Sequence, residues 1–168
     1  MRAGDTIRNN QTGEELTVLV SEEENGGARQ LYRVSIPPRR PSPPLHYHRD
    51  FTETFSVIEG KLDIYLGQER RHLFLGPEES ITASIGQLHT FANERDFPAM
   101  ITIETKPAAG VISAFQLAYG VANDGGAAKD GLSKNQLVRL VFIKMSEGFL
   151  ATGSGSRGRR FRDGQNAL

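Results

Sequence analysis

Turn-forming residues divide the apolar residues between Ile7 and Thr105 into short runs, and this pattern most narrows the possible folds. In the run Lys61 to Leu66, apolar side chains alternate with others, which is the period of a half-buried strand. Such runs predict about eight strands, at residues 16–20, 31–36, 55–58, 61–65, 71–75, 80–84, 88–93 and 100–105. We therefore expect an all-β sandwich or a small barrel, and a small barrel can hold one ligand in its mouth.

Glycine and proline mark the connections between these runs. Asn25-Gly26-Gly27 predicts a hairpin loop between residues 20 and 31, and Glu59-Gly60 predicts a two-residue link in which the glycine has a positive φ. Residues 36–44 carry five of the eight prolines. Because proline fixes φ and lacks a donor N–H, this segment predicts a stiff extended connection along a sheet edge.

The pattern becomes helical after Lys106-Pro107. The spacing of Val111, Phe115 and Tyr119 predicts a helix over 110–122, and Ser133 is the expected N-cap of a second helix over about 134–148. That second helix is apolar on nearly every side, so it should pack on the barrel wall or on a second subunit. We divide the chain into a barrel domain at 1–107, a helical extension packed on it at 108–150, and a flexible Gly/Ser/Arg-rich tail at 151–168.

Composition excludes several classes of protein. The 168 residues suit one domain, and 20 basic against 20 acidic side chains argue against a partner that is a nucleic acid or an acidic membrane. No apolar stretch approaches the roughly 20 residues that cross a bilayer. With no cysteine, disulfides and thiolate metal ligands are impossible, and we expect a cytoplasmic protein.

Three of the four histidines stand at positions that can form one metal site. His46 and His48 lie two residues apart, so on a strand both point to one face. A bend at Arg49-Asp50 would start a new strand near Glu53, and His89 can join from a further strand. Three imidazoles and one carboxylate suit one divalent transition metal per chain, namely Fe, Mn, Ni, Cu or Zn. His72 is expected to be an ordinary strand or surface residue.

These residues stand in a pattern that resembles the cupin family. The segment H-Y-H-R-D-F-T-E-T-F-S-V-I-E-G, residues 46–60, has the spacing of the first cupin motif, and G-Q-L-H-T-F-A-N, residues 86–93, has that of the second. Arg40, Glu78 and Ser84 replace turn-forming residues of the family pattern, but no ligand position is substituted. The resemblance implies a jelly-roll, or double-stranded β-helix, barrel, here followed by two C-terminal α-helices.

The resemblance also implies a metal-dependent protein that acts on a small organic molecule. A dioxygenase-like oxidoreductase is our first interpretation, and a metal-dependent isomerase or lyase and a non-catalytic small-molecule-binding cupin are the alternatives. Glu53 would be a metal ligand, a catalytic base, or both.

Strand parity predicts the lining of the pocket. If Glu53 and His89 face inward, so do Phe55, Val57 and Phe91, which would form an apolar wall for the substrate. Tyr47 should face away from the site, while Asp50 and Phe51 would lie at its mouth. Asn93 would cap a loop or contact the ligand. We also expect a homodimer, because the helix near Leu137 to Met145 is strongly apolar and sheet edges need cover.

Overall fold

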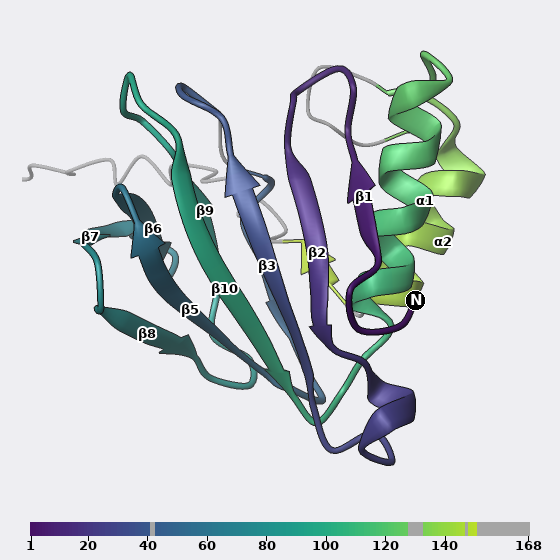
Figure 1. Cartoon of the computed structure of the whole chain (residues 1–168), viewed down its shortest axis with the longest axis horizontal. Helices are drawn as coiled ribbons and strands as arrows, with labels where there is room; N and C mark the ends of the chain where they lie inside the picture. Colours follow the sequence, from purple (N-terminus) through teal and green to yellow (C-terminus); the bar gives the residue numbers. More distant parts are fainter. Residues whose placement is uncertain (41–42, 128–132, 147, 151–168) are drawn as a thin grey trace, which may run out of the picture.

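Two antiparallel sheets enclose the core of the computed structural model, which describes residues 1–40, 43–127, 133–146 and 148–150 (Figure 1). The strands are β1 (Thr6–Arg8), β2 (Glu15–Val20), β3 (Gln30–Ile36), β4 (His46–His48), β5 (Thr52–Glu59), β6 (Leu62–Leu66), β7 (Arg71–Leu75), β8 (Ser80–Ala83), β9 (His89–Ala92), β10 (Ala99–Lys106) and β11 (Gly148–Leu150). One sheet has the order β1-β2-β3-β10-β5-β8 and the other β11-β4-β9-β6-β7. The predicted all-β barrel class is confirmed, and β1 and β11 are short edge strands that the sequence did not indicate.

The core lies between the two sheets and follows the two-residue period of the strands. Every second residue is buried from Glu53 to Val57 in β5 and along β10, and the register places Phe55 opposite Ile103 and Val57 opposite Ile101. All four residues of β9 are buried, because this strand is covered on both faces. Burial on one face of β5 is what directs the acidic side chain at position 53 into the interior.

The link at Glu59-Gly60 passes the chain from one sheet to the other. β5 belongs to the six-stranded sheet, whereas β6 pairs with β7 and β9 in the five-stranded one. Gly60 has the expected positive φ, +80°, and an added Cβ would lie 2.6 Å from the carbonyl oxygen of Pro98. This close approach, as well as the backbone conformation, requires glycine here.

Two other turns differ in detail from their sequence patterns. The loop between β2 and β3 forms the predicted hairpin but includes a 3₁₀ turn, η1 (Glu22–Glu24), whose N-terminus is closed by a capping box between Ser21 and Glu24. Glu78, where the family pattern has glycine, itself adopts a left-handed backbone with φ of 68°. The turn therefore keeps its shape although its residue type has changed.

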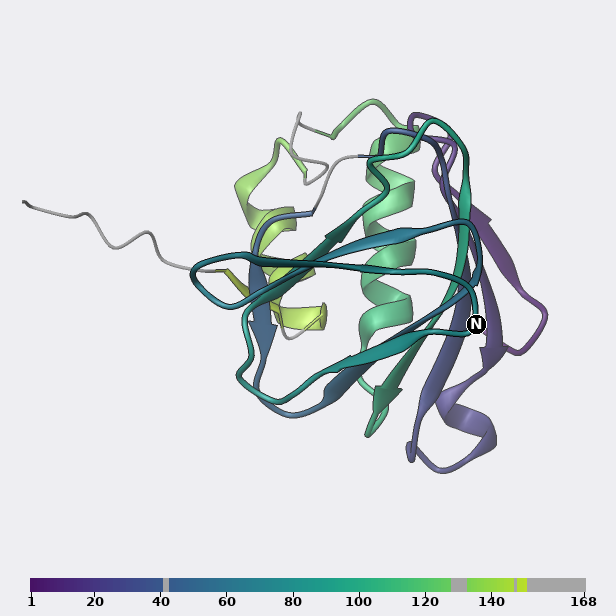
Figure 2. The same ribbon diagram turned by 90° about the vertical axis from the view of Figure 1, so that its left-hand side faces the viewer.

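Two helices, α1 (Val111–Asn123) and α2 (Gln136–Ser146), lie together on one side of the barrel, as Figures 1 and 2 show. They pack closely, since a Cβ on Gly110 would meet the Met145 carbonyl oxygen at 2.6 Å. Neither of these described helices has the length and apolarity needed to span a membrane.

The start and the end of α2 correct the prediction. Asn135, not Ser133, caps its first turn, because the Asn135 Oδ1 accepts hydrogen bonds from the Leu137 and Val138 amides at 2.9 and 3.5 Å. The Ser133 hydroxyl instead accepts from the Asn135 amide. The helix ends at Ser146, and residues 148–150, where its last predicted residue lies, form β11. The predicted tail at 151–168 lies outside the described residues, and the boundaries of the three proposed segments stay predictions.

Replacing Gly60 with alanine should destabilise the fold far more than replacing Gly26. Both glycines have a positive φ, which costs an alanine about 1–2 kcal/mol, but nothing lies within 4 Å of a Cβ on Gly26. The contact with Pro98 should bring the loss for Gly60→Ala to about 3 kcal/mol or more. Urea unfolding of both variants measures the difference, and equal losses would contradict the structure.

Candidate metal centre

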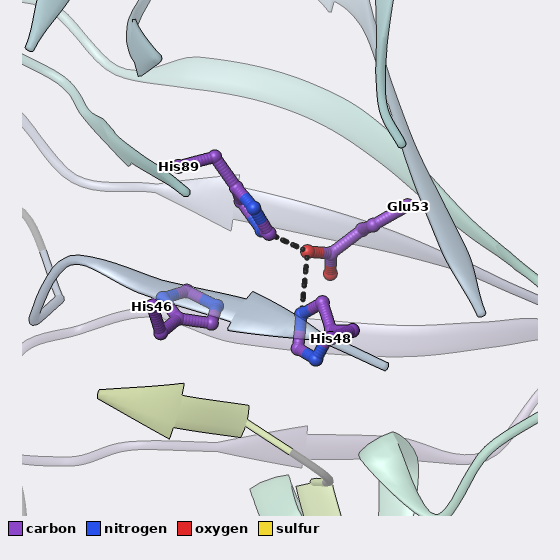
Figure 3. A group of neighbouring side chains, drawn as sticks. All are labelled: His46, His48, Glu53 and His89. Carbon is purple, nitrogen blue, oxygen red and sulfur yellow. Dashed lines mark hydrogen bonds and ion pairs between the residues drawn. The ribbon is translucent and has the colours of Figure 1, made fainter. Parts of the chain in front are cut away.

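Three strands from the two sheets bring the proposed ligands together (Figure 3). His46 and His48 lie on β4, and β4 pairs with β9 so that His46 stands opposite His89. Glu53 reaches them from β5 in the facing sheet. Each of the four residues offers a ligand atom, and these atoms all lie within 4.8 Å of one another. The bend at Arg49-Asp50 separates β4 from β5 and turns Glu53 toward the histidines, as its spacing required.

Backbone carbonyls fix the orientation of two of the imidazoles. The Nδ1 of His46 lies 2.8 Å from the carbonyl oxygen of Pro44, and the Nδ1 of His89 lies 2.9 Å from that of Gln87. Because a carbonyl only accepts hydrogen bonds, each Nδ1 carries a proton and donates. The Nε2 of each ring is left to face the centre, the arrangement common among metal-bound histidines.

Glu53 is held by several partners at once. Its Oε2 lies 2.9 Å from the Nε2 of His89 and 3.3 Å from that of His48. Its Oε1 accepts a hydrogen bond from the Tyr32 hydroxyl at 3.4 Å. Tyr32 was not among the residues predicted for the site, although its place in a predicted strand was the available signal.

The electrostatic environment keeps the carboxylate ionised and one imidazole neutral. Burial alone would raise the pKa of Glu53, but hydrogen bonds and charge from His48 and His89 outweigh it and lower the pKa. Burial, reinforced by His89, lowers the pKa of His46 to about 4. An ionised carboxylate beside oriented imidazoles in a buried site is a donor set that fits one divalent transition metal.

A cavity of about 130 Å³ adjoins the cluster, and His46, His48 and Glu53 line it. Its wall is mostly apolar and is formed in large part by the two helices, through Val111, Ala114, Phe115, Ala118, Tyr119, Phe142 and Ile143. The wall predicted from the sequence came only from strands and lacked this contribution. Helical spacing had indicated buried faces, but not that they would face this cavity.

The predicted pocket residues occupy two different layers. Phe91 lines the cavity. Phe55 lies behind it in the core, where its ring packs 5.3 Å from that of Phe91 and 6.0 Å from that of His89. Val57 is also buried in this core. Phe55 therefore packs against the imidazole of the candidate ligand His89 and against the ring of Phe91, but it does not itself line the cavity.

Other residues noted in the sequence have structural contacts. Tyr47 faces away from the site and stacks on Phe149. Phe51 is buried and stacks on His48 at 4.1 Å, so it backs a ligand instead of lying at the mouth. The Asn93 side chain ties a loop together through the carbonyls of Ile36, Pro37 and Phe97. His72 lies outside the cluster and contacts Asp63 at 2.9 Å.

With this geometry established, comparison with known proteins identifies the fold family. A family model described as "Cupin domain" matches residues 32–104, a span that contains all four candidate ligands. The barrel is a cupin domain. No curated protein gives a significant match.

Solved structures agree with this cupin fold. A predicted oxalate decarboxylase from Thermotoga maritima aligns with a TM-score of 0.53 at 16% identity, over 63% of this chain and 93% of that one. The protein TT1209 from Thermus thermophilus aligns with a TM-score of 0.51 at 19% identity, over 61% of this chain and 90% of the other. KdgF from a Halomonas species aligns with a TM-score of 0.50 at 14% identity, over 61% of this chain and 87% of the other. At these identities the likeness concerns the fold alone.

Removing one imidazole should abolish tight metal binding. His89→Ala deletes a candidate ligand, and no other donor of the described cluster can take its place. After loading and dialysis, the metal content of this variant should therefore fall from about one ion per chain to near zero. His72→Ala is the matched control, because His72 is a histidine outside the cluster. Elemental analysis of the purified proteins is the measurement, and unchanged metal in both His89→Ala and His46→Ala would refute the site.

Proposed function

We propose that this cupin is a metal-dependent enzyme that acts on a small organic molecule, as a dioxygenase-like oxidoreductase. One observation carries the proposal: a largely buried cluster of three histidines and one carboxylate adjoins a mainly apolar cavity, which His46, His48 and Glu53 line. Such cavities are the usual binding sites of small molecules. A bound divalent metal would supply Lewis acidity and, if redox-active, electron transfer to O₂.

The chain's own residues would prepare the site for this chemistry. His46, His48, Glu53 and His89 would hold the ion, and the carbonyls of Pro44 and Gln87 keep two imidazoles in the orientation that ligation needs. The apolar helix residues would exclude bulk water from the cavity, which strengthens electrostatic interactions inside it. Glu53, ionised and buried, would bind the ion and could accept a proton only weakly, because its lowered pKa makes it a weak base.

The two alternatives use the same residues differently. An isomerase or lyase would need only Lewis acidity, and a binding cupin would hold its ligand without turnover. The similar Thermotoga maritima protein is named as a predicted oxalate decarboxylase, and decarboxylases are lyases. The likeness to that protein concerns the fold alone, so only a measured reaction can decide among the three functions.

Oxygen dependence separates these functions. Protein loaded with Fe(II), Mn(II), Ni(II) or Cu(II) would be screened against one-ring carboxylates, phenols and diketones with an oxygen electrode, and in parallel under strict anaerobiosis. We expect O₂ uptake that requires both the metal and the substrate. His89→Ala should lose this uptake, and His72→Ala should retain it. Turnover without oxygen would favour the isomerase or lyase, and saturable binding without turnover would favour the binding protein.

The homodimer and the cytoplasmic location remain predictions from the sequence. Leu137, Leu140 and Val141 of α2 are 70%, 63% and 43% exposed, and a second copy of the chain would bury them. Light scattering at tens of micromolar should give the mass of a dimer, and Leu140→Glu should give that of a monomer. A monomeric wild-type protein would exclude this assembly.

A further inference from the structure

The cavity carries a second group of polar residues in addition to the metal ligands. Glu14, Arg40 and Tyr119 all line it, and they come from the segment before β2, the proline-rich connection and α1. None of them stands at a ligand position of the cupin motifs. Their role is not explained by the proposed metal centre.

This polar group lies at the end of the cavity away from the metal ligands. β9 begins at the ligand His89, and four residues later the amide of Asn93 donates to the carbonyl of Arg40 at 3.1 Å. At about 3.3 Å per residue, the two ends of this wall are about 13 Å apart. Phe91 lines the cavity between them.

The helix opposite gives the same arrangement. Val111, Phe115 and Tyr119 follow one another at intervals of four residues, so one face of α1 runs along the cavity. The ring of Phe115 packs 5.9 Å from that of Tyr32, whose hydroxyl contacts the candidate ligand Glu53, and 5.6 Å from that of Tyr119. Tyr119 thus marks the distal end of an aromatic wall that starts at the metal centre.

The Tyr119 hydroxyl has an unmet hydrogen-bonding capacity. Its side chain is only 4% exposed, and the hydroxyl oxygen has no well-formed hydrogen bond among the described residues. Burial, then the charge of Glu14 and a weak hydrogen-bonding interaction with it, raise the pKa of this hydroxyl. The two groups are therefore neighbours, although no bond between them has normal hydrogen-bond geometry. Leaving a buried polar group in this state is unfavourable. A hydroxyl of this kind that lines a cavity is suited to a bond with a ligand.

Glu14 has room for a ligand as well. It is 4% exposed, and its contacts with the Nε and Nη2 of Arg40, both at 3.4 Å, use the same oxygen, Oε2. The other oxygen, Oε1, can accept a further hydrogen bond. Since Arg40 offsets the charge of Glu14, this end of the cavity favours a neutral group that donates a hydrogen bond over an ammonium or a carboxylate.

We propose that Glu14 and Tyr119 form a subsite for a hydroxyl group on a one-ring ligand whose opposite end faces the metal centre. The hydroxyl of the ligand can donate a hydrogen bond to Glu14 Oε1 and accept one from the Tyr119 hydroxyl. Both side chains would then have a hydrogen-bond partner. The cavity of about 130 Å³ is close to the ~150 Å³ of an engineered cavity that takes benzene, so one ring fits between the two ends. This assignment rests on the proposed function and specifies its substrate class as hydroxylated one-ring compounds. An acid group at the opposite end would suit the metal centre, because divalent metals bind carboxylates.

The test compares ligands that differ only in the hydroxyl group. Titration calorimetry on the Zn(II)-loaded protein would measure 4-hydroxybenzoate against benzoate, and 4-hydroxyphenylacetate against phenylacetate, a pair longer by one methylene. In at least one pair we expect the hydroxylated acid to bind about tenfold more tightly, the worth of one or two good hydrogen bonds. Tyr119→Phe should reduce that preference to about threefold or less, and Glu14→Gln should reduce it as well.

A matched control and a stability measurement separate ligand recognition from structure. Tyr65→Phe removes another tyrosine hydroxyl, on β6 and outside the cavity lining, and should keep the full preference. Because the Tyr119 hydroxyl has no well-formed internal bond, metal-free Tyr119→Phe should melt at or above the wild-type temperature. A Tyr119→Phe variant that melts several degrees lower, or that keeps the preference, would overturn the subsite, as would equal affinities within both pairs.

Failure of the subsite and failure of the metal centre give different results. If Zn(II) binds and the plain acids bind, but the hydroxyl group adds nothing, the metal-dependent function stands and the subsite falls. If the wild-type protein does not retain Zn(II), the proposed function itself fails.

Discussion

The placement of one carboxylate, that of Glu53, governs the organisation of this cupin. A buried carboxylate must be matched by hydrogen-bond donors or positive charge, and removing a partner from a buried ion pair typically costs about 3–5 kcal/mol. Here the donors come from β4 and β9 of one sheet and from Tyr32 on β3 of the other. Matching Glu53 therefore ties the two sheets together at the point where the cavity begins.

The same requirement links stability to function. Two of the side chains that contact Glu53 in the protein alone, His48 and His89, are also ones that would share a metal ion with it. A metal bound there would compete with the imidazole–carboxylate contacts and would replace them with stronger bonds to the same atoms. The Pro44 and Gln87 carbonyls hold the rings of His46 and His89 by their Nδ1 atoms, and Phe51 stacks on the ring of His48. All three imidazoles are therefore oriented before any metal binds.

The sequence could predict the barrel class and the four candidate ligands because both depend on local patterns. The two-residue period of a strand places Glu53 and Phe55 on one face. In the same way it places His46 and His48 on one face, whatever the conformation of the neighbouring loops. The cavity could not be predicted in this way. Whether Phe55 lines the cavity or packs behind Phe91 depends on how deeply each ring lies in the barrel. The alternation along a strand gives the face of a side chain but not its depth. The walls from α1 and α2, and Glu14 beside Tyr119, depend on contacts between segments about a hundred residues apart, for which one sequence holds no signal.

The pairing of β11 with β4 has a consequence for the order of assembly. β4, which carries His46 and His48, pairs with β9 on one side and with β11 on the other. During synthesis, β4 therefore leaves the ribosome long before the strand that covers its outer edge, and both helices are made in the interval. An exposed strand edge invites pairing with other chains until it is covered. The outer edge of the histidine-bearing strand would thus be covered last, and β11 acts as the closing strand of the sheet that carries the three candidate histidine ligands.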